Sequence, residues 1–208
     1  MQSEASIDVS YIVPAYNAAA HIADAVRSAL AQADVRVEVI VVDDASSDDT
    51  AEIVGRLVGE ASGEREPNEP VVRLIRLPKN GGPSLARNAG IAAARGRWIG
   101  ILDADDTLEP DRTRHLLGLA EASEARIVAD NFSRIDGDGR VVSTAFPVGR
   151  EPYSFIIAPI DYIDGNVPMG NGFASGYLKP MFRTDVLSGG ADALASIRYD
   201  EKVRVGED

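Results

Sequence analysis

The sequence contains no cysteine among its 208 residues. A disulfide framework, a zinc site built on thiolates and a thiol nucleophile are therefore excluded. No apolar run approaches the roughly 20 residues that a bilayer-spanning helix needs, and residues 1–8 form neither a basic nor an apolar leader. We therefore expect no membrane span in this segment, with the cytoplasm as the default compartment.

Basic residues are scarce, since 21 Lys and Arg face 33 Asp and Glu and leave a formal net charge of -12. A chain of this charge repels nucleic acid and anionic lipid, so nucleic acid is a poor partner. Carboxylates can also hold a divalent cation in a nucleotide site, but a solvated acidic surface explains the same composition. The hydrophobic content of 45% suits one domain with a single core.

Short β-branched segments alternate with amphipathic segments along the first 130 residues. The predicted strands are residues 8–14, 36–43, 71–77, 97–103 and 125–130. The predicted helices are residues 18–32, 48–60 and 84–95, with a fourth after Pro110. This order predicts an α/β fold, a Rossmann-like mainly parallel sheet with helices on both faces.

The last third of the sequence lacks this alternation of strand-like and helix-like segments. Residues 132–146 carry two Asp-Gly pairs between strand-like flanks, which predicts a hairpin. Residues 165–180 are rich in glycine and proline, and an apolar segment follows at 181–187. We expect a smaller antiparallel and loop-rich part here.

Polar segments follow several predicted strands, where open α/β sheets bind ligands. Asp103, Asp105 and Asp106 end one such strand, and three close carboxylates need counter-charge or solvent. Magnesium or manganese would supply that charge through one or two carboxylates, leaving positions for water and phosphates. The competing interpretation, with equal weight, is a helix cap or a solvated turn.

Three other polar positions have both a functional and an ordinary explanation. Capping explains Ser47 or Asp48 but not the adjacent Asp43 and Asp44, one of which could accept the N3 hydrogen of a uracil ring. The Asn80-Gly-Gly loop offers backbone amides to an anion or is a plain turn. Arg87 would reach a phosphate, neutralise the aspartates, or lie on the surface.

Four motifs together resemble the family 2 glycosyltransferases of GT-A fold. They are VSYIVPAYN, VIVVDDASSDDT, NGGPSLARNAG and GRWIGILDADD, which follow one another from residue 9 to about residue 112. The segment LKPMFRTDVL and the terminal GED resemble the family more loosely, and the whole has the character of bacterial exopolysaccharide transferases such as those of succinoglycan assembly. The resemblance implies one GT-A catalytic domain over 1–208, with a nucleotide-sugar-binding half at about 8–131 and acceptor-side loops at about 132–208.

The resemblance also implies roles for individual residues. Asp105 would bind the metal, Asp103 would contact the ribose or sugar, and Asp208, with Glu207 close behind, would be the catalytic base. The alternative interpretation of Glu207 and Asp208 is that they are simply charged residues at a frayed chain end, without a catalytic role. The nucleotide-sugar-binding set that the resemblance implies is Pro14, Tyr16, Asn17, Asp44, Asn80, Arg87, Asp103 and Ala104.

The activity that the resemblance implies is metal-dependent and inverting. With Mn²⁺ or Mg²⁺, a hexose would pass from a UDP-sugar resembling UDP-glucose to a hydroxyl of a saccharide or lipid-linked oligosaccharide acceptor. The family normally continues beyond this motif set, so we expect a C-terminally truncated chain that binds donor and turns over poorly. The full-length protein would lie at the inner face of the membrane, and the sequence leaves room for a homodimer.

Three other functions compete. The segment ILDADDTL fits the Asp-x-Asp-x-Thr motif of haloacid-dehalogenase phosphohydrolases, but VIVVDD precedes it, whereas in that fold the nucleophile strand comes first. A sugar nucleotidyltransferase would need glycine and arginine after the first strand, and PAYNAAAH has neither. A non-catalytic nucleotide-binding module stays open, although the intact aspartates argue against a decayed site.

Overall fold

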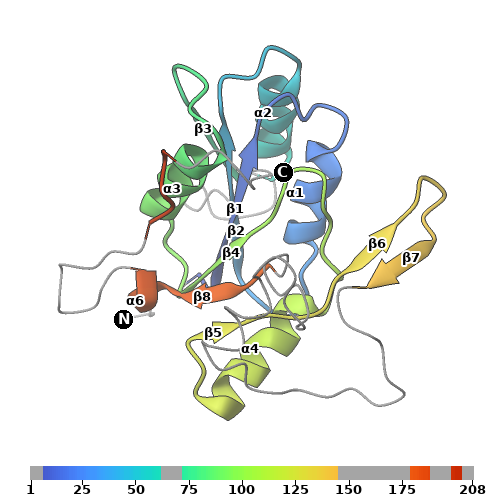
Figure 1. The fold of residues 1–208 in the computed structure, drawn as a ribbon, viewed down its shortest axis with the longest axis vertical. Helices are drawn as coiled ribbons and strands as arrows, with labels where there is room; N and C mark the ends of the chain where they lie inside the picture. The colour runs from blue at the N-terminus through green and yellow to red at the C-terminus, as the bar shows by residue number, and fades with distance from the viewer. Residues whose placement is uncertain (1–6, 62–71, 145–178, 188–197, 203–208) are drawn as a thin grey trace. The chain divides into compact units, whose positions relative to one another are not determined.

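The computed structural model describes residues 7–61, 72–144, 179–187 and 198–202. Figure 1 shows the order of the elements along the chain. The strands are β1 (Val9–Ala15), β2 (Val37–Asp43), β3 (Val72–Arg76), β4 (Trp98–Ile101), β5 (Ile127–Val128), β6 (Ser133–Ile135), β7 (Val141–Thr144) and β8 (Met181–Arg183). The helices are α1 (Ile22–Leu30), α2 (Thr50–Ala61), α3 (Pro83–Ala93), α4 (Arg112–Ser123) and α6 (Thr184–Leu187).

The main sheet has six strands in the order β3-β2-β1-β4-β8-β5. Strands β1 to β4 pair in parallel, and β8 runs antiparallel between β4 and β5. The predicted mainly parallel sheet is confirmed. The predicted strand 125–130 was too long, because β5 pairs only through Ile127 and Val128 with the short β8. The apolar segment 181–187 supplies this inserted strand and the helix α6.

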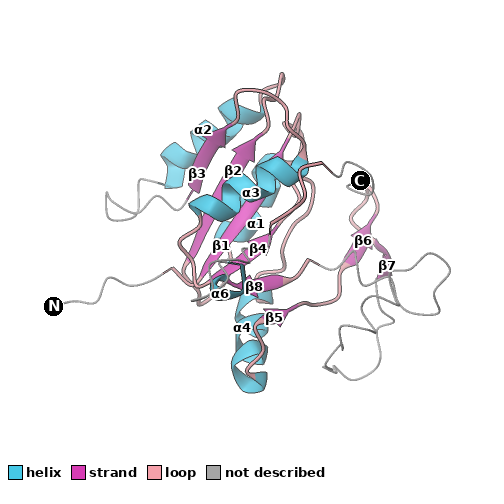
Figure 2. Cartoon of the chain, turned by 60° about the vertical axis from the view of Figure 1, so that its left-hand side comes forward, coloured by secondary structure: helices cyan, strands magenta, loops and turns pink. Residues whose placement is uncertain are grey.

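Helices cover both faces of the sheet, as predicted, and the arrangement can be followed in Figure 2. Tyr11 and Val13 of β1 belong to one buried cluster with residues of α1, α2 and α4. Ile12, which points the other way, belongs to a second cluster with Ala86 of α3 and Leu187 of α6. Every residue of β2 is buried, which is expected of a parallel strand with both faces covered.

The chain divides into two compact units, one formed by 1–128 with 181–208 and the other by 129–180. In the second unit, β6 and β7 form the predicted antiparallel hairpin. Its turn is closed by Asp136, whose side chain accepts the Arg140 N–H at 2.9 Å and whose carbonyl accepts the Gly139 N–H at 3.0 Å. No helix in the described part of the chain is long and apolar enough to cross a membrane.

Candidate functional site

The loops that follow β1 and β2 are tied to each other by Asn17. Its backbone N–H donates to Ser46 Oγ at 2.9 Å, and its Oδ1 accepts the Ser47 N–H at 2.9 Å. Asn17 has a φ of 50°, in the left-handed region that asparagine tolerates better than most residues. Asn17, predicted to bind the donor, therefore acts in the structure as a brace between two loops at the carboxyl edge of the sheet.

Asp48 adds a second tie between the same loops. Its Oδ2 accepts the Ala19 N–H at 3.0 Å, and its Oδ1 accepts the N–H and the hydroxyl of Thr50, the first residue of α2. Thr50 Oγ1 in turn accepts the Ala18 N–H at 2.8 Å. The Thr50 hydroxyl bond, followed by the backbone N–H bonds, holds the pKa of Asp48 below its ordinary 3.8. Asp48 is thus a structural cap, as the sequence suggested.

Asp44 is almost fully buried, with 3% of its surface exposed. Its Oδ1 accepts the Gly81 N–H and its Oδ2 accepts the Gly82 N–H, both at 2.8 Å. Asp44 therefore fixes the loop that leads into α3. Contact with a uracil N3–H stays a prediction, and it would use a second lone pair on one of these oxygens.

Asp43 is also buried and also has partners. Its Oδ1 accepts the Ser46 N–H at 3.1 Å, and its Oδ2 lies 3.3 Å from Nε of Arg76 at the end of β3. A buried carboxylate needs such bonds, because an unpaired charge there is costly. The pair of adjacent aspartates that capping could not explain therefore serves in part to join three strand ends.

Unlike the buried Asp43 and Asp44, Tyr16 is exposed, with 54% of its surface accessible. It directly follows β1, whose last residue, Ala15, accepts the Asp44 N–H at its carbonyl oxygen (2.8 Å). Pro14 lies half-buried within β1 just before it. An exposed aromatic ring at a strand end is available to stack on a flat ligand.

Asp103 to Asp106 form a turn directly after β4, closed by the Asp106 N–H to Asp103 carbonyl bond at 3.1 Å. Arg87 Nη2 lies 3.6 Å from Asp103 Oδ1, and the two side chains are 14% and 29% exposed. Ala104 packs against the first core cluster. Arg87 therefore neutralises one of the aspartates, which is one of the contacts that the sequence suggested.

Asp105 is exposed, and its side chain has no hydrogen bond or ion pair with any other described residue. No group of three or more acidic or histidine side chains converges on one point within the described ranges. The available donor set is therefore one carboxylate, with Asp103 two positions away. Such a set fits Mg²⁺ or Mn²⁺ completed by water and substrate phosphates, and it does not fit a cage made by protein alone.

The remaining predicted site residues are Asn80, Glu207 and Asp208. Asn80 is exposed in the loop before α3, next to the Gly81 amide that Asp44 holds. That amide is committed to Asp44, so the predicted anion cradle would need other N–H groups. Glu207 and Asp208, the predicted base pair, lie outside the described residues.

Neither Asn88 nor Tyr199 was predicted from the sequence to belong to the site. The Asn88 side chain bonds the backbone of Tyr199 across 111 positions of sequence, and the Arg87 guanidinium lies 5.2 Å from the centroid of the Tyr199 ring. Long-range pairs of this kind leave no local pattern.

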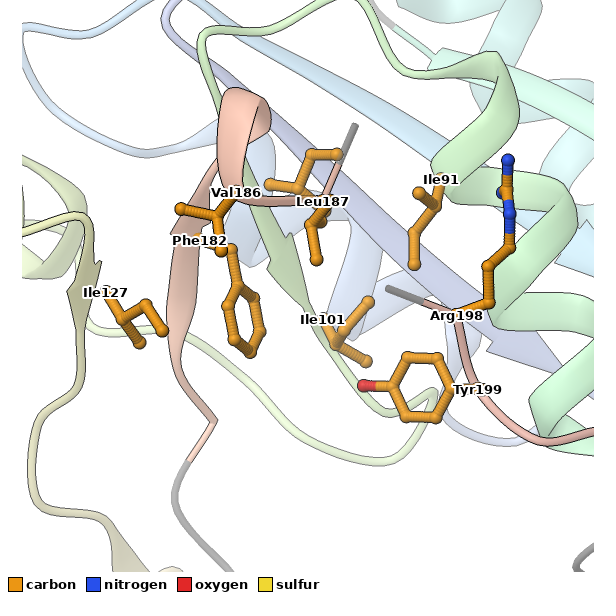
Figure 3. Close-up of a pocket in the computed structure, with 9 residues that line it drawn as sticks. Ile91, Ile101, Ile127, Phe182, Val186, Leu187, Arg198 and Tyr199 are labelled. Carbon is orange, nitrogen blue, oxygen red and sulfur yellow. The ribbon is translucent and has the colours of Figure 1, made fainter. Parts of the chain in front are cut away.

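An apolar pocket of about 240 Å³ lies between α3, β4, β8 and α6. Figure 3 shows the Tyr199 ring beside Ile101, with Ile91, Phe182 and Leu187 on the other walls. None of the described residues that line this pocket carries a carboxylate. It is therefore distinct from the polar edge that carries Tyr16 and Asp105.

The sequence of residues 10–185 matches the Glycosyl transferase family 2 family, and the chain belongs to that family. It is 42% identical to the succinoglycan biosynthesis protein ExoO of Rhizobium meliloti (strain 1021) over 203 residues, which are 97% of this chain and 53% of that protein. It is 34% identical to ExoU of the same organism over 210 residues, covering 100% of this chain and 56% of that protein. The chain spans about half the length of these curated relatives.

Solved structures match the fold. The S. aureus TarS 1-349 structure in complex with UDP superimposes with a TM-score of 0.66 at 21% identity, covering 96% of this chain and 52% of that one. The mannosyltransferase PcManGT from Pyrobaculum calidifontis, in complex with GDP-Man and Mn²⁺, gives a TM-score of 0.53 at 26% identity over 63% of this chain and 37% of that one. The predicted family and GT-A fold are confirmed. Membership of this family argues against the phosphohydrolase and the sugar nucleotidyltransferase alternatives.

Proposed function

We propose that this chain binds a UDP-sugar together with Mn²⁺ or Mg²⁺, as the donor-binding part of an inverting glycosyltransferase. The observation that carries the proposal is Asp105, which is exposed and has no side-chain partner among the described residues, two positions after Asp103, which pairs with Arg87, at the carboxyl end of β4. Strands β1 and β4 pair in parallel, so the exposed Tyr16 belongs to the same edge of the sheet. A base-stacking ring and a cation ligand are the groups that a nucleoside diphosphate requires.

The proposed roles are those that the family resemblance implies. Tyr16 stacks on the uracil, and Asp44 accepts its N3–H. Asp103, oriented by Arg87, accepts a hydrogen bond from a ribose or sugar hydroxyl, and Asp105 ligates the cation. When bound, the cation stabilises the negative charge of the departing diphosphate. Arg87 adds a cation that can bond two phosphate oxygens at once.

Transfer needs a base as well as a donor site. Asp208 or Glu207 removes the proton from the acceptor hydroxyl, whose oxygen then attacks the anomeric carbon from the side opposite the diphosphate, and this inverts the configuration. A well-placed general base contributes about 10²- to 10⁴-fold to the rate. The chain spans about half the length of its curated relatives, and we propose that it binds donor but turns over slowly.

The proposed donor is a UDP-hexose resembling UDP-glucose, and the proposed acceptor is a saccharide or lipid-linked oligosaccharide in exopolysaccharide assembly. Similarity to the two succinoglycan biosynthesis proteins supports the acceptor class. The TarS structures in complex with UDP and with UDP-GlcNAc support a uridine donor. PcManGT in complex with GDP-Man and Mn²⁺ supports the cation.

Release of UDP from UDP-sugars tests this function. With manganese present, we expect slow UDP release that falls at least tenfold in Asp208→Asn or Glu207→Gln, by the general-base contribution. Glu121→Gln, which changes an exposed carboxylate on α4, is the matched control. UDP binding without any UDP release would favour the non-catalytic binding module, and hydrolysis of p-nitrophenyl phosphate would contradict the transferase proposal.

A further inference from the structure

Residues 198–202 contain no helix or strand, yet one side chain of α3 holds them in place. Asn88, 7% exposed, accepts the Tyr199 N–H at Oδ1 (2.9 Å) and donates from Nδ2 to the Tyr199 carbonyl (2.9 Å) and to Glu201 Oε1 (3.0 Å). The Asn88 amide thus occupies both backbone groups of Tyr199, as a neighbouring strand would. The position of Tyr199 is set by Asn88.

The neighbouring residue on α3 is Arg87, and its guanidinium lies 5.2 Å from the centroid of the Tyr199 ring. This distance is within the range of an attractive cation–π contact. The same guanidinium lies 3.6 Å from Asp103 Oδ1. Two fixed groups, an aromatic ring and a carboxylate, therefore restrict an otherwise flexible side chain.

Restricting an arginine matters when it must bind a ligand. A free arginine side chain loses considerable rotamer entropy when it is fixed, and fixing it beforehand leaves less to lose on binding. Asp103 balances the charge of Arg87 but at 3.6 Å makes no close hydrogen bond with it. Packing of Arg87 over the Tyr199 ring supplies the second restraint on the guanidinium.

We propose that Tyr199, held by Asn88, is a positioning residue that pre-organises Arg87 for the diphosphate of the donor. The inference rests on the proposed function, because it takes Arg87 as a phosphate ligand. The same turn of α3 links the proposed donor site to residues 198–202, because Arg87 pairs with Asp103 and Asn88 bonds Tyr199. Residues 198–202 precede Glu207 and Asp208 in the sequence. Tyr199 itself need not touch the donor.

The test compares a ligand that has the diphosphate with one that lacks it. For Tyr199→Leu we expect UDP binding with manganese to weaken about three- to tenfold, the loss of one cation–π contact, and uridine binding to stay unchanged. Tyr199→Phe keeps the ring and should bind UDP like the unaltered chain. Asn88→Ala removes all three hydrogen bonds and should act in the same direction as Tyr199→Leu. Leu119→Ala is the control, because Leu119 on α4 is exposed to the same degree, 37% against 36%.

Each outcome bears on the inference. Equal weakening of UDP and uridine in Tyr199→Leu would mean a general effect on the fold and would overturn it. Unchanged UDP binding in Tyr199→Leu, while Arg87→Ala weakens it, would overturn it and leave the proposed function standing. Failure of the unaltered chain to bind UDP at all would remove the proposed function and this inference with it.

Discussion

Asp44 and Gly82 are joined by a 2.8 Å hydrogen bond from the Gly82 N–H to Asp44 Oδ2, across 38 positions of sequence. Gly82 is the residue before α3, and its backbone has φ 87° and ψ 166°, a region that essentially only glycine occupies. The end of β2 thus fixes the start of the helix that carries Arg87 and Asn88. The loops of the site are held in place from the interior of the sheet.

Gly82→Ala should therefore destabilise the chain by about 1–3 kcal/mol, the typical strain of a side-chain-bearing residue in such a conformation. Among the described residues, apart from Gly82 itself and its chain neighbours, none has an atom within 4 Å of the added Cβ, so the loss arises from the backbone and not from a clash. Urea unfolding measures it. The control is Gly55→Ala in the exposed middle of α2, where the added Cβ also meets open space. This substitution should stabilise the chain by about 0.5–1 kcal/mol, because alanine is a better helix former than glycine. A Gly82→Ala protein as stable as the unaltered chain would contradict the described loop.

Gly90→Ala tests the packing of α3 on the sheet. A Cβ at this position would lie 2.2 Å from Cγ2 of Ile12 in the middle of β1. Both residues are buried there, and overpacking of a core usually costs about 1–3 kcal/mol. We expect a lower urea midpoint for Gly90→Ala. Combining it with Ile12→Leu should partly restore the midpoint, because leucine has a single γ carbon and lacks the Cγ2 methyl that the added Cβ would meet. Additive losses in the double variant would show that the two residues do not meet.

The ion pairs of Asp185 predict a defined pH dependence. The Arg183 guanidinium, bonded at 2.9 and 2.7 Å, lowers the pKa of Asp185 from 3.8 to about 2, with Arg126 contributing less. Because the folded pKa is the lower one, this stabilisation is present above about pH 4 and is lost as the pH falls through 2. Arg183→Gln should raise the pKa of Asp185 toward 3.8, as carboxyl NMR titration would detect.

The stability of the two proteins should converge in the same window. The difference in melting temperature between the unaltered chain and Arg183→Gln should be largest above about pH 4 and should shrink toward pH 2. Arg56→Gln, which removes an exposed pair with Glu52 on α2, is the control. A difference that stays constant down to pH 2 would contradict the assignment.

Much of the fold could be predicted because its signals are local. The apolar run that became β2 and the alternation around it predicted a parallel sheet, and β2 ends at Asp43 as predicted. The strand predicted for 97–103 was too long, because β4 ends at Ile101. The insertion of β8 could not be predicted. Three residues, Met181–Arg183, carry too little pattern to reveal a strand, and their partners on β4 are about 80 positions away.

The candidate site divides in the same way. The places of Tyr16 and Asp105 after strand ends could be predicted from the motifs, and their binding roles stay predictions. The partners of the buried groups could not be predicted. Asp44 resembled a free ligand in the sequence because its donors, Gly81 and Gly82, are brought to it only by the packing of α3. The contact of Asn88 with Tyr199 depends likewise on tertiary structure.

The measurement that tests the central claim most directly is calorimetric titration of UDP with and without manganese, on the unaltered chain and on Asp105→Ala. We expect manganese-dependent binding of UDP, much weaker binding of ADP and GDP, and loss of the manganese dependence in Asp105→Ala. Asp105 has no side-chain partner in the described part of the chain, so that variant should keep its stability within about 0.5 kcal/mol. UDP binding that is absent, or that does not depend on manganese and Asp105, would contradict the proposed donor site.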